Sequence, residues 1–258
     1  MSLESVSLAG RVAIVTGAGM GMGEATARLF AARGAKVVLA DINAAAGEAA
    51  AASIRDDGGE ARFVACDVSD EASVAAMVAA TVEAFGRLDC AVNNAAITPD
   101  LLPIAEADMA AWDRVIAVDL RGVMLCMKYE IRQMLAQGTG GAIVNISSVS
   151  GVRPQPGNPA YVAAKHGVIG LTKAGSMDYA PKGIRVNAVL PGAIDTPMLR
   201  EALETNNFTE EQFAPVLSLL GRFGRPEEVA EASAWLCSDA SSYVTGHSLA
   251  VEAGYLTR

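Results

Sequence analysis

Residues 11–41 constrain the fold more than any other part of the chain. Residues 11–16 form a short apolar run bounded by glycine, and residues 17–23 form a glycine-rich turn. Residues 24–33 then show helical spacing, and a second apolar run, residues 36–40, ends on Asp41. The order strand, glycine turn, helix, strand and acid predicts a βαβ unit whose turn faces a ligand.

The same alternation of strand and helix continues along the chain, with Ala-rich helical segments between apolar runs. Four further runs are expected to be strands: residues 62–66, 89–93, 142–147 and 184–190. Alternation of strand and helix predicts an α/β fold with a parallel sheet covered by helices on both faces. Polar residues and glycines follow the ends of these runs, which is where open α/β sheets bind ligands.

Composition narrows the possible partners and the compartment. The 258 residues are 52% hydrophobic and carry a net charge of −9, without a basic block, so nucleic acid and an anionic membrane surface are not expected partners. The first residues lack the plan of a signal peptide, and no apolar run is long enough to span a membrane. The four cysteines are scattered, so we expect free thiols in a cytoplasmic protein and no metal site.

The glycine-rich turn and Asp41 predict the cofactor. Gly17, Gly21 and Gly23 allow a pyrophosphate to approach the backbone, and the following helix offers free N–H groups. A carboxylate at the end of the second strand can accept hydrogen bonds from ribose hydroxyls and repels a 2′-phosphate. No cation follows Asp41 directly, so NAD is favoured over NADP.

Ser148, Tyr161 and Lys165 predict the chemistry. Tyr161 and Lys165 are four residues apart, which places both side chains on one face of a helix. An ammonium beside a phenol favours the phenolate, which can then exchange a proton with an alcohol or a carbonyl oxygen. Ser148 follows a strand-like run and can hold that oxygen. A Tyr–Lys pair at this spacing also occurs on helices without any function, so the neighbouring motifs carry the interpretation.

Two regions depart from the regular alternation. Residues 112–137 read as a long helix whose middle, residues 123–127, is apolar all round, which suggests a subunit contact. Residues 196–224 are polar and read as an irregular, mobile insert, with Asn206, Asn207 and Pro215, that closes over a substrate. The alternative for this insert is a surface helical hairpin without function.

Taken together, these motifs resemble the short-chain dehydrogenase/reductase family, in its compact single-domain branch. The resemblance covers nearly the whole chain. It rests on Thr16-Gly17-x-x-x-Gly21-x-Gly23, Asp67-Val68, Asn93-Asn94-Ala95, Ser148, Tyr161-x-x-x-Lys165, Asn187 and Pro191-Gly192-x-x-x-Thr196. It implies a Rossmann fold with a doubly wound parallel sheet of about seven strands, residues 1–258 as one NAD-binding domain, and a homotetramer.

The resemblance also assigns roles to individual residues. Tyr161 is the expected acid/base, Ser148 orients the substrate, and Lys165 also binds the nicotinamide ribose. Asp67 and Val68 contact the adenine, Asn93 and Ala95 border the adenosine ribose and the sheet centre, and Ile194 and Thr196 hold the carboxamide. The full set expected around the cofactor is Gly17, Gly19, Met20, Gly21, Met22, Asp41, Ile42, Asp67, Val68, Asn94, Ala95, Ala96, Tyr161, Lys165, Pro191, Gly192, Ile194 and Thr196.

Three positions depart from the family pattern. Asp119 stands where the family usually has an asparagine that bends the long helix and holds a water leading from the lysine. We expect Asp119 to belong to the catalytic site, although its charge near Lys165 can weaken the pull of the lysine on Tyr161. Ala96 replaces the commoner glycine, and residues 251–255 replace the usual Asp-Gly-Gly, which can alter the subunit interface or the far edge of the pocket.

The substrate is expected to be a small molecule, an apolar or cyclic secondary alcohol or its ketone. The side chains expected in the pocket wall are Val149, Val152, Pro154, Pro191, Ala193, Met198 and Leu199, with Arg153 close to them. Two alternatives stay open. One is a non-catalytic NAD-binding protein in which Asp119 has disabled the proton path, and the other is an enoyl or β-ketoacyl carrier-protein reductase.

Overall fold

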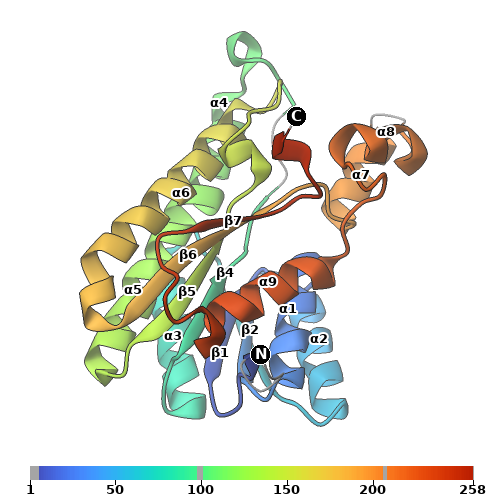
Figure 1. The fold of residues 1–258 in the computed structure, drawn as a ribbon. Helices are drawn as coiled ribbons and strands as arrows, with labels where there is room; N and C mark the ends of the chain where they lie inside the picture. Colours follow the sequence, from blue (N-terminus) through green and yellow to red (C-terminus); the bar gives the residue numbers. More distant parts are fainter. Residues whose placement is uncertain (1–5, 98–100, 206–207, 258) are drawn as a thin grey trace.

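A single parallel sheet of seven strands forms the centre of the molecule (Figure 1). The computed structural model describes residues 6–97, 101–205 and 208–257. The strand order is β3-β2-β1-β4-β5-β6-β7, and every pair of neighbours is parallel. The strands are β1 (Val12–Thr16), β2 (Lys36–Asp41), β3 (Glu60–Ala65), β4 (Cys90–Asn93), β5 (Gly141–Ile146), β6 (Ile184–Pro191) and β7 (Ser248–Val251).

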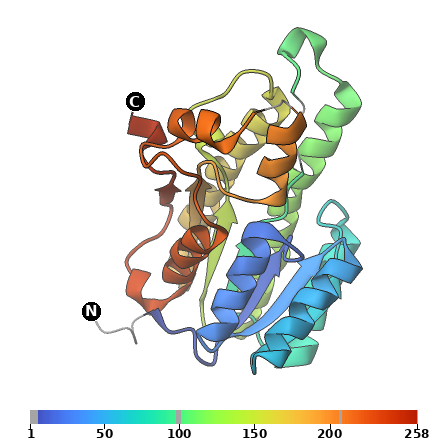
Figure 2. The same ribbon diagram turned by 90° about the vertical axis from the view of Figure 1, so that its right-hand side faces the viewer.

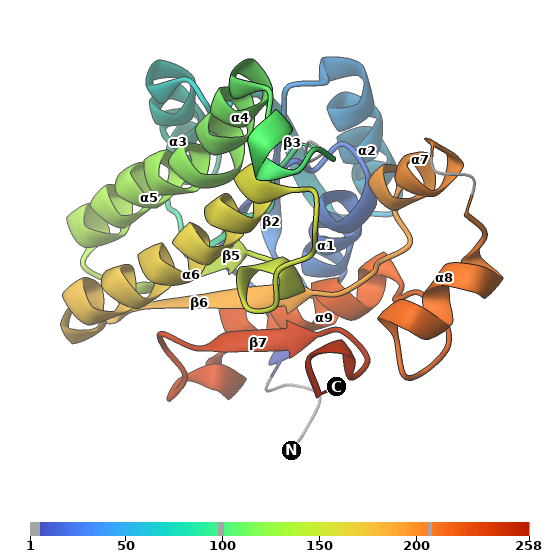
Figure 3. The ribbon, with the colours of Figure 1, turned by 90° about the horizontal axis from the view of Figure 1, so that it is seen from above.

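Helices cover both faces of the sheet, as Figure 3 shows from above. The helices α1 (Gly21–Ala32), α2 (Ala44–Asp56) and α9 (Pro226–Cys237) share one hydrophobic core with the sheet. The helices α3 (Glu71–Phe85), α5 (Val123–Gln137) and α6 (Pro159–Tyr179) share the second core. Successive residues of β1 alternate between them, since Ala13 belongs to the first core and Ile14 to the second. The doubly wound Rossmann fold expected from the sequence is therefore confirmed.

The strand boundaries differ from the sequence-based ones by one or two residues. The largest shift is in β3, which begins at Glu60 because its register pairs Glu60 with Lys36 and Ala65 with Asp41. The seventh strand was not identified from its own residues. It has only four residues, and each of them is partly exposed because β7 lies at the edge of the sheet, so no continuous apolar run marks it.

The long helical segment contains a local change of helical pitch. It consists of α4 (Met109–Val115), a π-helical turn η3 (Ile116–Gly122) and α5 (Val123–Gln137). It begins three residues before the expected start, because Asp108 caps it by accepting a hydrogen bond from the N–H of Ala110. In the apolar middle of the segment Met124 is 47% exposed and its neighbours are buried. The expected subunit contact there stays a prediction.

The described part of residues 196–224 is mostly helical, which corrects the expectation of an irregular insert. They contain α7 (Pro197–Thr205) and α8 (Glu210–Leu217). Thr209 and Gln212 form a capping box at the start of α8, so polar residues that suggested a loop in fact begin a helix. Leu203, Ala214 and Phe223 form a small hydrophobic cluster beneath them. Asn206 and Asn207 lie outside the described residues.

The two helices lie at the same end of the molecule as α4 and the C-terminus (Figures 1 and 2). Short 3₁₀ turns complete the fold: η2 (Ile104–Glu106), η4 (Val149–Gly151), η5 (Ala180–Lys182), η6 (Asp239–Ser241) and η7 (Tyr255–Thr257). Within the described residues, none of the helices combines the length and the apolar character that crossing a membrane requires.

Candidate active site

Two adjoining cavities open at the carboxyl ends of the strands. One has a volume of about 340 Å³ and the other about 430 Å³. We call them the cofactor cavity and the substrate cavity. Five residues line both: Met22, Ser147, Tyr161, Thr196 and Met198. A ligand in one cavity can therefore meet a ligand in the other beside the Tyr161 phenol.

Most of the residues expected around a dinucleotide line the cofactor cavity. These are Gly17, Met20, Gly21, Met22, Asp41, Ile42, Asp67, Val68, Asn94, Ala95, Ala96, Tyr161, Lys165 and Thr196. Pro191, Gly192 and Ile194 line the substrate cavity instead. Gly19 lines neither; its backbone N–H donates to Asp41 Oδ2 at 2.8 Å, so it supports the wall rather than forming it.

The glycines of the first turn allow the backbone to pack more closely than any side chain would permit. Gly17 has a φ of +61°, and a Cβ there would lie 2.8 Å from Ala95 Cα. A Cβ on Gly23 would lie 2.1 Å from the carbonyl oxygen of Gly17. Helix α1 begins at Gly21 without a side-chain cap, so its first N–H groups are available to an anion. These features fit the pyrophosphate of a dinucleotide.

Asp41 and Asn94 fix the shape of the turn. Asp41 Oδ1 accepts a second hydrogen bond, from the N–H of Asn43 at 2.8 Å. Asn94 Nδ2 donates to the carbonyl oxygens of Thr16 and Gly17, at 2.9 and 3.1 Å. The Asn94 side chain thereby ties the end of β4 to the turn after β1, a positioning contact that the expected ligand role did not include.

Helix α6 brings Tyr161 and Lys165 together as the spacing predicts. Lys165 is only 2% exposed, and its Nζ lies 5.2 Å from the centroid of the Tyr161 ring. The ammonium donates a hydrogen bond to the Ile146 carbonyl oxygen at 3.3 Å and lies 3.4 Å from Asp119 Oδ2. Burial opposes the charge of Lys165, but Asp119 and Tyr161 outweigh it and raise the pKa of the ammonium.

Asp119 lies in the π-helical turn and is completely buried. Its Oδ1 accepts a hydrogen bond from the N–H of Ile97 at 3.0 Å. Its Oδ2 makes the ion pair with Lys165 but no hydrogen bond of good geometry. Burial raises the pKa of Asp119, while the charge of Lys165 acts in the opposite direction. The direct carboxylate–lysine contact considered from the sequence is therefore present.

Ser148 follows β5 and begins the short turn η4. Its Oγ accepts a hydrogen bond from the N–H of Ser150 at 3.1 Å, which leaves its own O–H available to a ligand. The preceding Ser147 donates to the carbonyl oxygen of Lys165 at 2.8 Å and joins the strand end to α6. Ser148 and Tyr161 line the same cavity. Together they can hold and protonate an oxygen atom.

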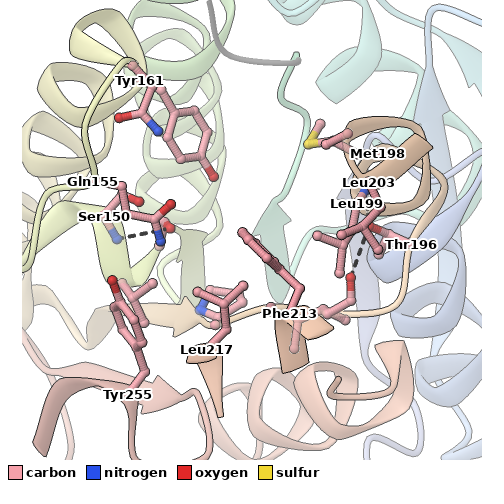
Figure 4. Close-up of a pocket in the computed structure, with 18 of the residues that line it drawn as sticks. Ser150, Gln155, Tyr161, Thr196, Met198, Leu199, Leu203, Phe213, Leu217 and Tyr255 are labelled. Atoms are coloured by element: carbon pink, nitrogen blue, oxygen red, sulfur yellow. Dashed lines mark hydrogen bonds between the residues drawn. The ribbon is translucent and has the colours of Figure 1, made fainter. Parts of the chain in front are cut away.

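The substrate cavity has a polar side and an apolar side. In Figure 4, Tyr161, Gln155, Ser150 and Tyr255 lie on one side, and Met198, Leu199 and Leu203 of α7 lie on the other. Of the expected wall residues, five line the cavity: Val149, Pro191, Ala193, Met198 and Leu199. The catalytic end is polar, and the opposite wall is apolar.

Three expected wall residues lie elsewhere. Val152 is 53% exposed, and Pro154 lines a separate surface groove beside α4. The guanidinium of Arg153 lies 4.9 Å from the ring centroid of Tyr255 and donates to the Tyr255 carbonyl oxygen at 3.0 Å. Arg153 therefore contacts the C-terminal segment and is not among the residues that line the cavity.

Several lining residues were not identified from the sequence. They include Leu101, Gln155, Asn158, Leu203, Phe208, Phe213, Leu217 and Tyr255. The apolar residues of the two insert helices show the helical spacing that would have marked one buried face, had the insert been recognised as helical. Nothing in the spacing connects Tyr255 with Ser148, since only the fold brings them together. Within the described part of the chain, no group of three or more His, Cys, Asp or Glu side chains is placed to hold a metal ion.

A family model described as "Enoyl-(Acyl carrier protein) reductase" matches residues 17–256. The short chain dehydrogenase/reductase astE of Aspergillus oryzae is 49% identical over 252 residues, which cover 97% of each chain. Two further relatives each align over 96% of this chain and 98% of their own length. The cis-4-hydroxycyclohexanecarboxylate dehydrogenase of Sinomonas cyclohexanicum is 49% identical, and the 2,5-dichloro-2,5-cyclohexadiene-1,4-diol dehydrogenase of Sphingobium indicum is 47% identical.

Solved structures share the whole fold. Levodione reductase is 38% identical, with a TM-score of 0.89 over 95% of this chain and 97% of its own. An Agrobacterium tumefaciens structure with bound NADP is 36% identical, with a TM-score of 0.89 over 98% and 99% of the two chains. The 3-ketoacyl-(acyl-carrier-protein) reductase of Brucella melitensis, complexed with NADH, is 38% identical, with a TM-score of 0.88 over 96% and 99%. Both nicotinamide cofactors thus occur among similar structures.

Proposed function

The chain belongs to the short-chain dehydrogenase/reductase family, and from this premise we propose that it interconverts a cyclic secondary alcohol and its ketone with NAD. The observation that carries the proposal is the position of Tyr161 at the junction of the two cavities, beside the buried ammonium of Lys165 and in the same cavity as Ser148. A phenol in this position can exchange a proton with a substrate oxygen.

The proposed proton transfer uses three side chains. Ser148 donates a hydrogen bond to the substrate oxygen, and Tyr161 as phenolate takes the hydroxyl proton during oxidation. Lys165 stabilises the phenolate by its charge, and Asp119 and the Ile146 carbonyl oxygen hold the ammonium in place. Bound NAD would supply the hydride chemistry. In the reverse direction Tyr161 returns the proton to the oxygen of the ketone.

The choice of NAD is supported by Asp41, whose carboxylate lines the cofactor cavity. Both of its oxygens are held by backbone N–H groups, so the negative charge is fixed where a 2′-phosphate of NADP would be repelled. We expect kcat/KM to be higher with NAD than with NADP. A preference for NADP would refute the role proposed for Asp41.

The substrate class is supported by the cavity and by the relatives. A volume of about 430 Å³ and an apolar wall suit a ring of moderate size. Two relatives nearly half identical to this chain are named as dehydrogenases of a cyclohexadienediol and of a hydroxycyclohexanecarboxylate. A carrier-protein substrate is less well supported, because the net charge is −9 and the sequence has no basic block for an acidic partner.

The test measures NADH formation with a panel of cyclic secondary alcohols, together with two tyrosine variants. Tyr161→Phe is expected to lower kcat by about 100-fold or more, because it removes the acid/base, and to leave NAD binding in place. Tyr179→Phe, at the other end of α6, is the matched control and is expected to keep its turnover. Full activity of Tyr161→Phe would remove Tyr161 from the mechanism. Bound NAD without turnover of any alcohol or ketone would favour a non-catalytic binding protein.

A further inference from the structure

Asn158 is a buried amide in the substrate cavity that has no role in the mechanism above. It immediately precedes α6, three residues before Tyr161, and it lines the same cavity. Its side chain is 7% exposed. Its Oδ1 is buried and has no hydrogen-bond partner among the described residues. The amide oxygen is therefore buried and unpaired, in a residue that lines the same cavity as Tyr161.

The unpaired state cannot be explained by a structural role at the start of the helix. An asparagine in this position usually accepts a hydrogen bond from the first turn of the helix, but the Asn158 side chain makes no such bond. The next residue is Pro159, which has no N–H to donate. A buried polar group without a partner lowers the stability of the fold. A half-turn of the carboxamide would bring its oxygen to the cavity that Asn158 lines, where a ligand can supply the missing partner.

The rest of the cavity restricts where a polar ligand group can be satisfied. The wall formed by α7 and α8 presents Met198, Leu199, Leu203, Phe213 and Leu217, none of which offers a strong donor or acceptor (Figure 4). Asn158 immediately precedes the first turn of α6, which carries Tyr161, so we place it on the Tyr161 side of the cavity. A second oxygen on the substrate ring would therefore find a hydrogen-bond partner on the Tyr161 side of the cavity and none on the apolar wall.

We propose that the Asn158 carboxamide binds a second hydrogen-bonding group of the substrate, so that the preferred substrates are cyclic secondary alcohols with an additional ring hydroxyl or carbonyl. A carboxamide suits both groups, because it donates through its NH₂ and accepts through its oxygen, and a half-turn of the amide exchanges the two. The inference deepens the proposed function and depends on it.

The test compares substrates that differ only in the second group. The cis and trans isomers of 1,3- and 1,4-cyclohexanediol are compared with the corresponding methylcyclohexanols in the wild-type enzyme. A hydrogen bond to a buried amide contributes about 1.4 kcal/mol, so kcat/KM is expected to be about tenfold higher for at least one diol than for its methyl analogue. In Asn158→Leu this ratio is expected to fall to about one, chiefly through a higher KM for the diol.

Gln155→Leu serves as a matched control, because it removes a partly exposed amide from the same cavity. It is expected to keep the diol preference. A preference that survives in Asn158→Leu, or that is lost in Gln155→Leu instead, would overturn the assignment to Asn158. Equal losses for diol and methyl analogue in Asn158→Leu would show a structural role only. Absence of NADH from every alcohol would refute the proposed function itself, which is a different outcome.

Discussion

Glu130 is expected to make the stability of the protein fall as the pH rises through neutrality. This residue of α5 is completely buried, and its Oε2 accepts a hydrogen bond from Asn93 Nδ2 at 3.1 Å. The same Nδ2 donates to Asn145 Oδ1 at 3.0 Å, and Glu130 Oε1 has no hydrogen-bond partner in the part of the chain that the structure describes. No ion pair within the described ranges includes Glu130. Burial raises the pKa of this carboxyl from 4.5 to about 8, against a smaller opposing effect of Asn93.

The sign and size of the effect follow from this pKa. A carboxyl whose pKa is raised by folding contributes stability that is fully present below pH 4.5 and is lost as the pH rises through about 8. One pKa unit corresponds to about 1.4 kcal/mol, so the whole shift corresponds to about 5 kcal/mol. Between pH 5.5 and pH 8 the free energy of unfolding is expected to fall by about 3 kcal/mol because of Glu130 alone.

Glu130→Gln removes the ionisation and keeps the shape of the side chain. The new amide leaves an unpaired N–H₂ where Oε1 was unpaired, so a constant cost of about 1–3 kcal/mol is expected at every pH. The informative quantity is therefore the difference between variant and wild type as a function of pH. That difference should move in favour of the variant by about 3 kcal/mol between pH 5.5 and pH 8.

Urea unfolding at one protein concentration, followed by the fluorescence of Trp112 and Trp235, measures this difference. Glu71→Gln is the control, because this exposed carboxylate on α3 pairs with Lys128 and its pKa is lowered. The difference in free energy of unfolding between Glu71→Gln and the wild type is expected to be constant between pH 5.5 and pH 8. If the difference in free energy of unfolding between Glu130→Gln and the wild type is constant as well, the reasoning is refuted. Glu130 would then be ionised at neutral pH, or water would reach it.

Three further predictions concern the site and the thiols. Gly23→Ala is expected to abolish dinucleotide binding, measured by calorimetry, because its Cβ would overlap the Gly17 carbonyl oxygen. Asp119→Asn is expected to shift the rise of kcat/KM with pH to lower pH, because the charge that balances Lys165 is removed. All four cysteines are buried, and burial raises the pKa of Cys66. A disulfide-exchange reagent is therefore expected to label fewer than one thiol per folded chain and four after denaturation.

The parts of the fold that were predictable are those specified by local spacing. The βαβ unit around Gly17 was predictable because its strands are buried on both faces and so read as apolar runs. The pairing of Tyr161 with Lys165 follows from a spacing of four residues on a helix. The edge strand β7 could not be predicted in this way, because none of its four residues is buried.

The walls of the substrate cavity were only partly predictable, because they come from segments far apart in the sequence. Val152 was placed in the wall because it is apolar and close to Ser148, but the chain turns it towards solvent after η4. Phe213 and Tyr255 reach the cavity only because α8 and the C-terminal segment lie over it. Local patterns describe each element, and tertiary packing decides which of their side chains face one another.

The balance of charge around Lys165 explains why it matters that this chain has Asp119 where the family usually has an asparagine. When Asp119 is ionised and Tyr161 is neutral, the cluster of Lys165, Asp119 and Tyr161 has no net charge. The ammonium of Lys165 and the carboxylate of Asp119, which lie 3.4 Å apart, balance each other. Loss of the Tyr161 proton then leaves one uncompensated negative charge beside the buried ion pair, which is unfavourable. With asparagine at position 119 the same step would lead from one positive charge to none. Oxidation by this chain should therefore depend more strongly on a positive charge supplied from the cofactor cavity. This dependence should weaken in Asp119→Asn, in which the amide oxygen can still accept the hydrogen bond from the Ile97 N–H.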